Sequence, residues 1–145
     1  MTTTPTLDHL RRLLLRQELG ITGLSQSDQG LLLVAAAITI PAATTFTEKE
    51  ITELLHQWLS TVGSNIRDDA VELRRYLVDS RLLTRDPAGR AYSRSVCWPD
   101  KWKEVAADLE SIDIEAFAEQ VRTEEIERRA ARKKAALEKK NSLSS

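Results

Sequence analysis

Cysteine and histidine are scarce in this sequence, which has one cysteine and two histidines among 145 residues. Cys97 has no second cysteine with which to form an internal disulfide, and this suits a reducing compartment. His9, His56 and Cys97 are too few and too scattered to form a metal site of recognisable spacing. We therefore expect neither a disulfide nor a bound metal.

Glycine is also rare, and the five glycines are isolated, so no glycine-rich loop is present to hold a phosphate group. The sequence contains no nucleophile elbow and no paired-carboxylate motif. We expect a non-enzymatic protein with no catalytic residues and no cofactor.

Long apolar runs and an excess charge of one sign are absent as well. The longest apolar run, LLLVAAAITI at 31–40, is about half the length that crosses a bilayer. The first residues, MTTTPTLDHLRR, lack a basic start followed by an apolar stretch. Lys and Arg total 21 against 22 Asp and Glu, so net charge predicts no particular partner. We expect a cytoplasmic protein that does not enter membranes.

The sequence predicts four helices in its first 80 residues. Leucines at helical spacing predict a helix at 7–19, before Gly20. Ser25 is placed to cap a nearly all-apolar, and therefore buried, helix at 28–38. After a loop at 41–45, Thr47 and Glu50 are spaced as a capping box for a helix at 47–60. A turn at 63–65 precedes a helix at 68–80 that begins with acidic residues.

Two short apolar segments, LLT and AYS, flank turn residues Asp86, Pro87 and Gly89 and predict a β-hairpin over 82–94. Three helices followed by a hairpin is the order of a winged helix-turn-helix, whose third helix enters the major groove. The predicted fold is mainly α with a small β-hairpin. It comprises an N-terminal helical extension (1–24), a winged-helix-like domain (25–96), an amphipathic helical segment with a break near 111–113 (97–121) and a charged tail, helical or disordered (122–145).

The segments FTEKEITELL, LRRYLVDSRLLTRD and GRAY resemble the prokaryotic domain of unknown function 2087. Members of that family share a T-E-K-E helix start, an L-R-R-x-L-V-D helix and an L-L-x-R-x-x-x-G-x-x-Y ending. The resemblance covers about residues 28–95. It implies a prokaryotic, regulator-like protein, because members occur alone or joined to DNA-binding regulator domains, and it supplies no reaction.

Arginine is the residue type best suited to contact DNA here, because its planar fork pairs with phosphates and guanine edges. Between 67 and 94 there are seven arginines and five carboxylates. Arg85, Arg90 and Arg94 on the hairpin are candidates for phosphate contacts. Arg75 is the candidate on the outward side of the preceding helix. Each of these also has a plain alternative, which is ordinary surface charge.

Four other residues carry two interpretations each. Arg74 and Arg81 lie beside the apolar side of their helix, so each either pairs with a carboxylate such as Glu50 or Glu53 or contacts DNA. Trp98 and Trp102 are spaced for one helical stripe. They therefore pack in the core or form a helix–helix interface in preference to a ligand cage.

The C-terminal third has opposite charges in its two parts. Residues 100–121 contain two basic and seven acidic residues, whereas 122–140 contain eight basic and four acidic. This pattern permits a solvated helix, pairing between C-terminal segments of two copies, or a basic arm. The sequence thus favours a DNA-binding, transcription-regulator-like protein. The alternative is a protein-interaction module in which the winged scaffold and C-terminal helix dock a partner or a second copy.

Overall fold

The computed structural model describes residues 4–143, beginning with a helix that is shorter than the leucine pattern predicts. α1 spans Pro5–Leu14; the Thr4 side chain accepts a hydrogen bond from the Leu7 amide, and proline occupies the first turn. The predicted end of this helix at residue 19 is wrong. A short 3₁₀ turn, η1 (Ile21–Gly23), follows instead of a continuous helix.

A contact from far along the chain ends α1 early. The side-chain amide of Asn65 donates to the carbonyl oxygens of Leu13 at 3.0 Å and Arg16 at 2.8 Å. Leu19 is then extended: its amide donates to Asn65 and its carbonyl accepts from Arg67, each at 2.8 Å. These bonds satisfy backbone groups that a longer helix would have paired internally.

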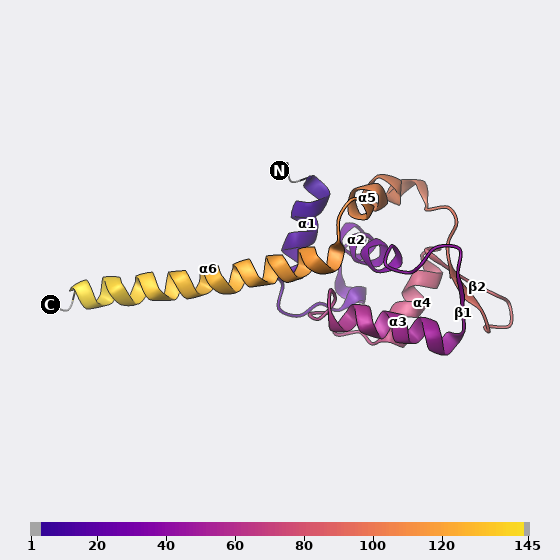
Figure 1. Ribbon diagram of the computed structural model, residues 1–145, viewed down its shortest axis with the longest axis horizontal. Helices are drawn as coiled ribbons and strands as arrows, with labels where there is room; N and C mark the ends of the chain where they lie inside the picture. Colours follow the sequence, from indigo (N-terminus) through magenta and orange to yellow (C-terminus); the bar gives the residue numbers. More distant parts are fainter. Residues whose placement is uncertain (1–3, 144–145) are drawn as a thin grey trace.

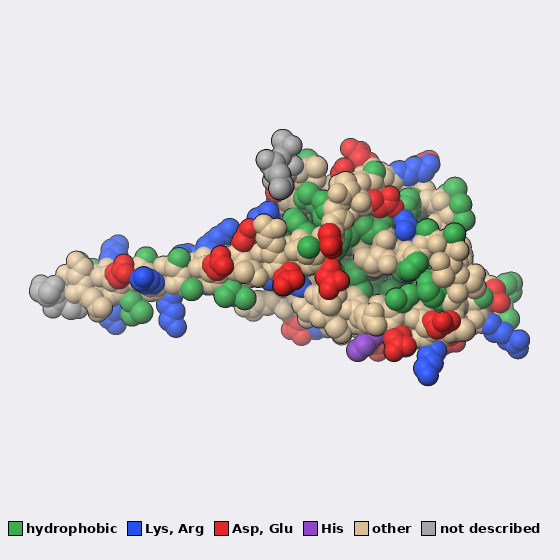
Figure 2. All heavy atoms as spheres, viewed as in Figure 1, with side chains coloured by type: hydrophobic (Ala, Val, Ile, Leu, Met, Phe, Trp, Pro, Cys, Tyr) green, Lys and Arg blue, Asp and Glu red, His purple; other side chains and the backbone are tan. Residues whose placement is uncertain are grey.

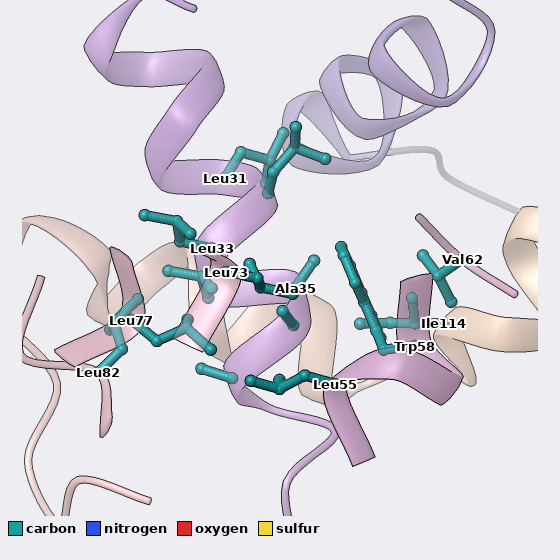
Figure 3. Packing of buried hydrophobic residues seen from close by; sticks show 14 of the residues in the cluster. Leu31, Leu33, Ala35, Leu55, Trp58, Val62, Leu73, Leu77, Leu82 and Ile114 are labelled. Atoms are coloured by element: carbon teal, nitrogen blue, oxygen red, sulfur yellow. The ribbon is translucent and has the colours of Figure 1, made fainter. Parts of the chain in front are cut away.

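α2 (Gln26–Ala37) is the central helix, and the prediction that it is buried is confirmed. The Ser25 hydroxyl accepts from the Asp28 amide at 3.1 Å, and every residue from Gly30 to Ala37 is buried. Figure 3 shows Leu33 and Ala35 surrounded by Leu55, Leu73 and other side chains from the helices around α2. An apolar helix without a polar face requires such cover on all sides.

α3 (Glu48–Ser60) and α4 (Ala70–Asp79) pack against each other, and both begin with a capping box. The Thr47 hydroxyl accepts from the Glu50 amide, and the Glu50 carboxylate accepts from the Thr47 amide, as predicted. Asp69 and Glu72 form the second box at the start of α4. Each box satisfies two amides that no helical carbonyl can reach.

Three strands form one antiparallel sheet in the order β1-β3-β2. The predicted hairpin is confirmed as β2 (Leu83–Arg85) and β3 (Tyr92–Arg94), with Leu83 opposite Arg94. β1 (Thr45–Phe46) pairs with the other edge of β3. The loop predicted at 41–45 is therefore wrong at Thr45, because two strand residues are too few to show an alternating pattern.

Two helices complete the chain. α5 (Asp100–Glu110) packs on α1 and α2, and a break before α6 (Ile114–Leu143) confirms the interruption predicted near residues 111–113. α6 buries Ile114, Ala118 and Val121 and then projects away from the body (Figure 1). Of the two alternatives for the charged tail, the structure has the helix as far as Leu143, and the expected boundary at 121–122 falls inside it.

The protein is thus mainly helical, with a small three-stranded sheet and a long C-terminal helix (Figure 1). Within residues 4–143, none of the helices combines the length and the apolar character needed to span a membrane.

Candidate nucleic-acid interface

The hairpin turn brings Arg85 and Arg90 to one end of the sheet. The Asp86 carboxylate accepts from the Ala91 amide at 3.0 Å and from the Arg90 amide at 2.6 Å, and these backbone hydrogen bonds lower the pKa of Asp86. Gly89 has φ +70°. A Cβ atom there would lie 2.5 Å from Arg85 Nη2, so the Arg85 side chain folds across the turn.

The exposed arginine of α4, Arg75, lies close to the hairpin. Arg75 and Arg85 line the same hollow of about 190 Å³, together with Glu48, Asp79 and Tyr92, among others. Within residues 4–143, no carboxylate oxygen lies within 4.0 Å of the guanidinium nitrogens of Arg75, Arg85 or Arg90. The structure therefore brings three of the four arginines that were predicted to contact DNA to one end of the molecule.

The fourth, Arg94, is held inside the protein. Its side chain is 16% exposed, its Nη2 donates to Glu110 at 2.5 Å, and its guanidinium lies 4.9 Å from the centre of the Trp98 ring. Longer contacts reach the carbonyls of Ile38 and Ile40 at 3.5 and 3.4 Å. This environment ties β3 to α2 and α5, so we leave Arg94 out of the interface.

Arg74 likewise has structural partners. It donates to the Thr52 hydroxyl at 2.7 Å, pairs with Glu48 at 3.3 Å and lies 5.3 Å from the centre of the Tyr92 ring. The carboxylate partner is Glu48, whereas the sequence suggested Glu50 or Glu53. Glu50 is engaged in the capping box instead, where the hydrogen bonds from Thr47 lower its pKa.

Arg81 serves the end of α4 through its backbone. Its φ is +63°, its amide donates to Val78 at 3.1 Å, and the Leu82 amide donates to Leu77 at 3.0 Å. These two bonds form a Schellman motif, in which the left-handed residue is usually glycine. The Arg81 side chain is exposed. The motif therefore depends on the left-handed backbone of residue 81, and the guanidinium group has no part in it.

We expect Arg81→Gly to stabilise the fold by about 1 kcal/mol, because glycine adopts positive φ without steric cost. Urea unfolding of the variant and the natural chain measures the difference. Arg12→Gly, in the last turn of α1 where the backbone is helical, is the contrasting variant and should lose about 1 kcal/mol. A destabilised Arg81→Gly chain would contradict this account of the helix end.

The two tryptophans pack within the chain. Trp98 is half-buried beneath Arg94, as described above. Trp102 reaches α2, because a Cβ atom on Gly30 would lie 1.9 Å from a ring carbon of Trp102. Of the interpretations given to the two tryptophans, packing in the core therefore applies to Trp102, whose ring joins α5 to α2.

Carboxylates also gather at the start of α4, beside a second hollow that shares Glu48 and Arg74 with the hollow at the hairpin. A hollow of about 780 Å³ between α3 and α4 is lined by Glu48, Glu53, Asp69 and the exposed Val71, among others. Asp69 and Glu72 are fixed there by the capping box. The N-terminal end of α4 is therefore acidic, and phosphate groups are repelled from it.

Sequence reasoning missed one polar residue of structural importance, Arg122 of α6. Its guanidinium donates to the carbonyls of Thr61 and Val62, both at 2.7 Å, and to the Asn65 side-chain oxygen at 3.1 Å. Burial lowers the pKa of Arg122, which stays charged at neutral pH. No local signal marks this residue, because its partners lie about 60 residues earlier.

Comparison with known families matches residues 24–94 to a family described as an uncharacterized protein conserved in bacteria (DUF2087). This supports membership of the DUF2087 family. The matched DUF2087 segment contains α2, α3, α4 and the whole sheet, and it leaves out α1, α5 and α6. No curated protein and no solved structure matches the chain significantly. Among residues 4–143, no group of three or more potential metal ligands is close enough to hold an ion.

Proposed function

We propose that the DUF2087 segment is a winged helix-turn-helix that binds duplex DNA, with the β2–β3 hairpin as the wing. The order α2, β1, α3, α4, β2, β3 supports this assignment, as does the pairing of β1 with the outer side of β3. In this arrangement α3 supports α4, and the wing lies beside the DNA backbone.

The observation that carries the proposal is the exposed, unpaired state of Arg85 and Arg90 at the tip of the hairpin. Both side chains are exposed, and among the described residues no carboxylate oxygen lies within 4.0 Å of either guanidinium. Arg85 has only a longer-range attraction to the neighbouring Asp86, and this attraction contributes to lowering the pKa of Asp86. A guanidinium without an internal partner is available to bind phosphate oxygens and release counterions from DNA. Arg75, which borders the same hollow as Arg85, extends this surface onto α4.

The acidic start of α4 limits how the DNA lies. Asp69 and Glu72 are held by backbone amides at that end, so phosphates are expected near Arg75, at mid-helix, and near the hairpin. Helix-turn-helix proteins commonly read bases with the first turns of this helix. We therefore propose binding that depends mainly on backbone contacts.

The double variant Arg85→Ala/Arg90→Ala tests the proposal. It should weaken binding to different duplex sequences about equally and reduce the slope of log K against log[salt] by about 2, one for each lost phosphate contact. Fluorescence anisotropy with a mixed-sequence duplex at several salt concentrations measures both quantities. Lys101→Ala/Lys103→Ala on α5 removes the same charge elsewhere and should leave the slope unchanged. Equal slopes for the natural chain and the hairpin variant would refute the assignment.

A second candidate function is a protein-interaction module, and the hollow between α3 and α4 favours it. Lys49 and Arg74 line this hollow too, and Arg74 pairs with Glu48. The other two carboxylates, of Glu53 and Asp69, and the 42% exposed Val71 suit a partner segment with both basic and apolar side chains. Absence of duplex binding even at low salt would make this function the better one. Mass in solution and retention on heparin separate the two candidates further, because only a polyanion-binding surface gives salt-sensitive retention.

A further inference from the structure

α6 has two halves of opposite charge. Residues 114–127, which lie against the body, carry five carboxylates and one arginine, whereas residues 128–143 carry seven Lys or Arg and one glutamate. Figure 2 shows acidic side chains where the helix meets the body and basic ones along its projecting part. We propose that a second copy of the chain packs antiparallel along α6, with the two-fold axis near Ile126.

One stripe of the helix is suited to this contact. Its members follow one another at intervals of three or four residues and therefore share a face. They are Glu115, Glu119, Thr123, Ile126, Ala130, Lys133, Leu137 and Lys140. The residues that α6 buries against its own body, Ile114, Ala118 and Val121, lie on a different face. The stripe is thus open to a partner while α6 stays docked.

The stripe is complementary to itself when it is reversed. Glu119 lies seven residues before Ile126 and Lys133 lies seven after it, each about 10 Å along the helix axis. An antiparallel copy therefore places its Lys133 opposite Glu119, and symmetry repeats the pair. Lys140 of the second copy comes within about one turn of Glu115. A parallel arrangement would instead place like charges together.

Apolar groups along the stripe supply the contact with a core, with Ile126 at its centre and Leu137 nearer its end. Ile126 is 69% exposed and Leu137 is 53% exposed, with Ala130 between them on the same face. Beside the stripe lies a hollow of about 360 Å³ lined by Thr61, Ser64, Glu115, Glu119 and Ile126, among others. The Leu137 side chain of an antiparallel copy reaches this hollow, so the contact removes isolated apolar groups from water.

Charge reversal tests both the dimer and its register. Sedimentation of the full chain from low to high micromolar concentration should show a monomer–dimer equilibrium. Glu119→Lys and Lys133→Glu should each weaken dimerisation about tenfold, because each turns two attractive pairs into repulsive ones. The double variant Glu119→Lys/Lys133→Glu should restore dimerisation. Lys139→Glu makes the same charge change away from the stripe and should have little effect.

Several results would overturn the proposal. A chain that stays monomeric at every concentration would do so, as would a dimer that ignores both single reversals or that the double variant fails to restore. A monomer whose heparin retention falls in Lys133→Glu would assign the distal half of α6 to a polyanion. None of these results depends on Arg85 or Arg90, so failure here leaves the proposed function of the hairpin untouched. Circular dichroism of each variant confirms that α6 is still helical.

Discussion

Arg122→Met should lower the free energy of unfolding by about 3 kcal/mol, because three acceptors lose a charged donor at once, and two of them, on Val62 and Asn65, are partly buried. The carbonyls of Thr61 and Val62 and the side-chain oxygen of Asn65 all depend on this guanidinium. Thr61 is the C-cap of α3, where a positive charge also interacts favourably with the helix dipole. Methionine keeps a side chain of similar length in place, so the loss measured is mainly that of the hydrogen bonds.

Urea unfolding followed by circular dichroism measures this change. Arg128→Met is the matched control, because Arg128 is exposed on the same helix and pairs only within it, with Glu125 at 3.4 Å. That control should cost a few tenths of a kcal/mol. A loss of the same small size for Arg122→Met would show that α6 does not depend on this contact.

Gly30→Ala should destabilise the protein by about 2 kcal/mol, although alanine normally favours a helix over glycine. The new methyl carbon would lie 1.9 Å from a ring carbon of Trp102, so the indole or α5 must shift. In a Trp102→Ala background the obstruction is gone. The same Gly30→Ala change should then stabilise the protein by about 1 kcal/mol, its ordinary helix-propensity gain.

The four chains form a double-mutant cycle, and the reversal of sign is the result that identifies direct contact. Thermal or urea unfolding of each chain provides the values. Gly23→Ala serves as a comparison, because a Cβ atom there meets nothing within 4 Å. If Gly30→Ala has the same effect in both backgrounds, α5 does not pack on α2 through Trp102.

Features encoded by neighbouring residues could be predicted from the sequence. The Thr47–Glu50 capping box, the buried α2 and the turn at Asp86 and Gly89 each depend on residues within one or two turns of one another. Features fixed by distant residues could not be predicted. α1 stops at Leu14 because Asn65 binds its last carbonyls, and β1 exists because Tyr92 pairs with Phe46.

The arginines of the candidate interface likewise include some whose exposure could be predicted from the sequence and one whose burial could not. Exposure of Arg75, Arg85 and Arg90 agrees with the pattern of polar residues around them. Arg94 was indistinguishable from these in sequence, yet Glu110 and Trp98 from the following segment enclose it. Which arginine of a hairpin is free thus depends on the element packed beside each strand, and that packing is not visible in the spacing of residues.

Asn65 connects the end of α1, the turn after α3 and the start of α6, so we expect these three segments to unfold locally together. Its amide nitrogen holds the end of α1, and its oxygen accepts from Arg122 on α6, beside the turn that follows α3. Amide protons near these three places should therefore exchange with solvent at similar free energies of opening. Detaching the first turns of α6 from the body would therefore also lower the free energy of local opening at the end of α1. The docking of the long C-terminal helix thus influences how often the N-terminal part of the protein opens locally.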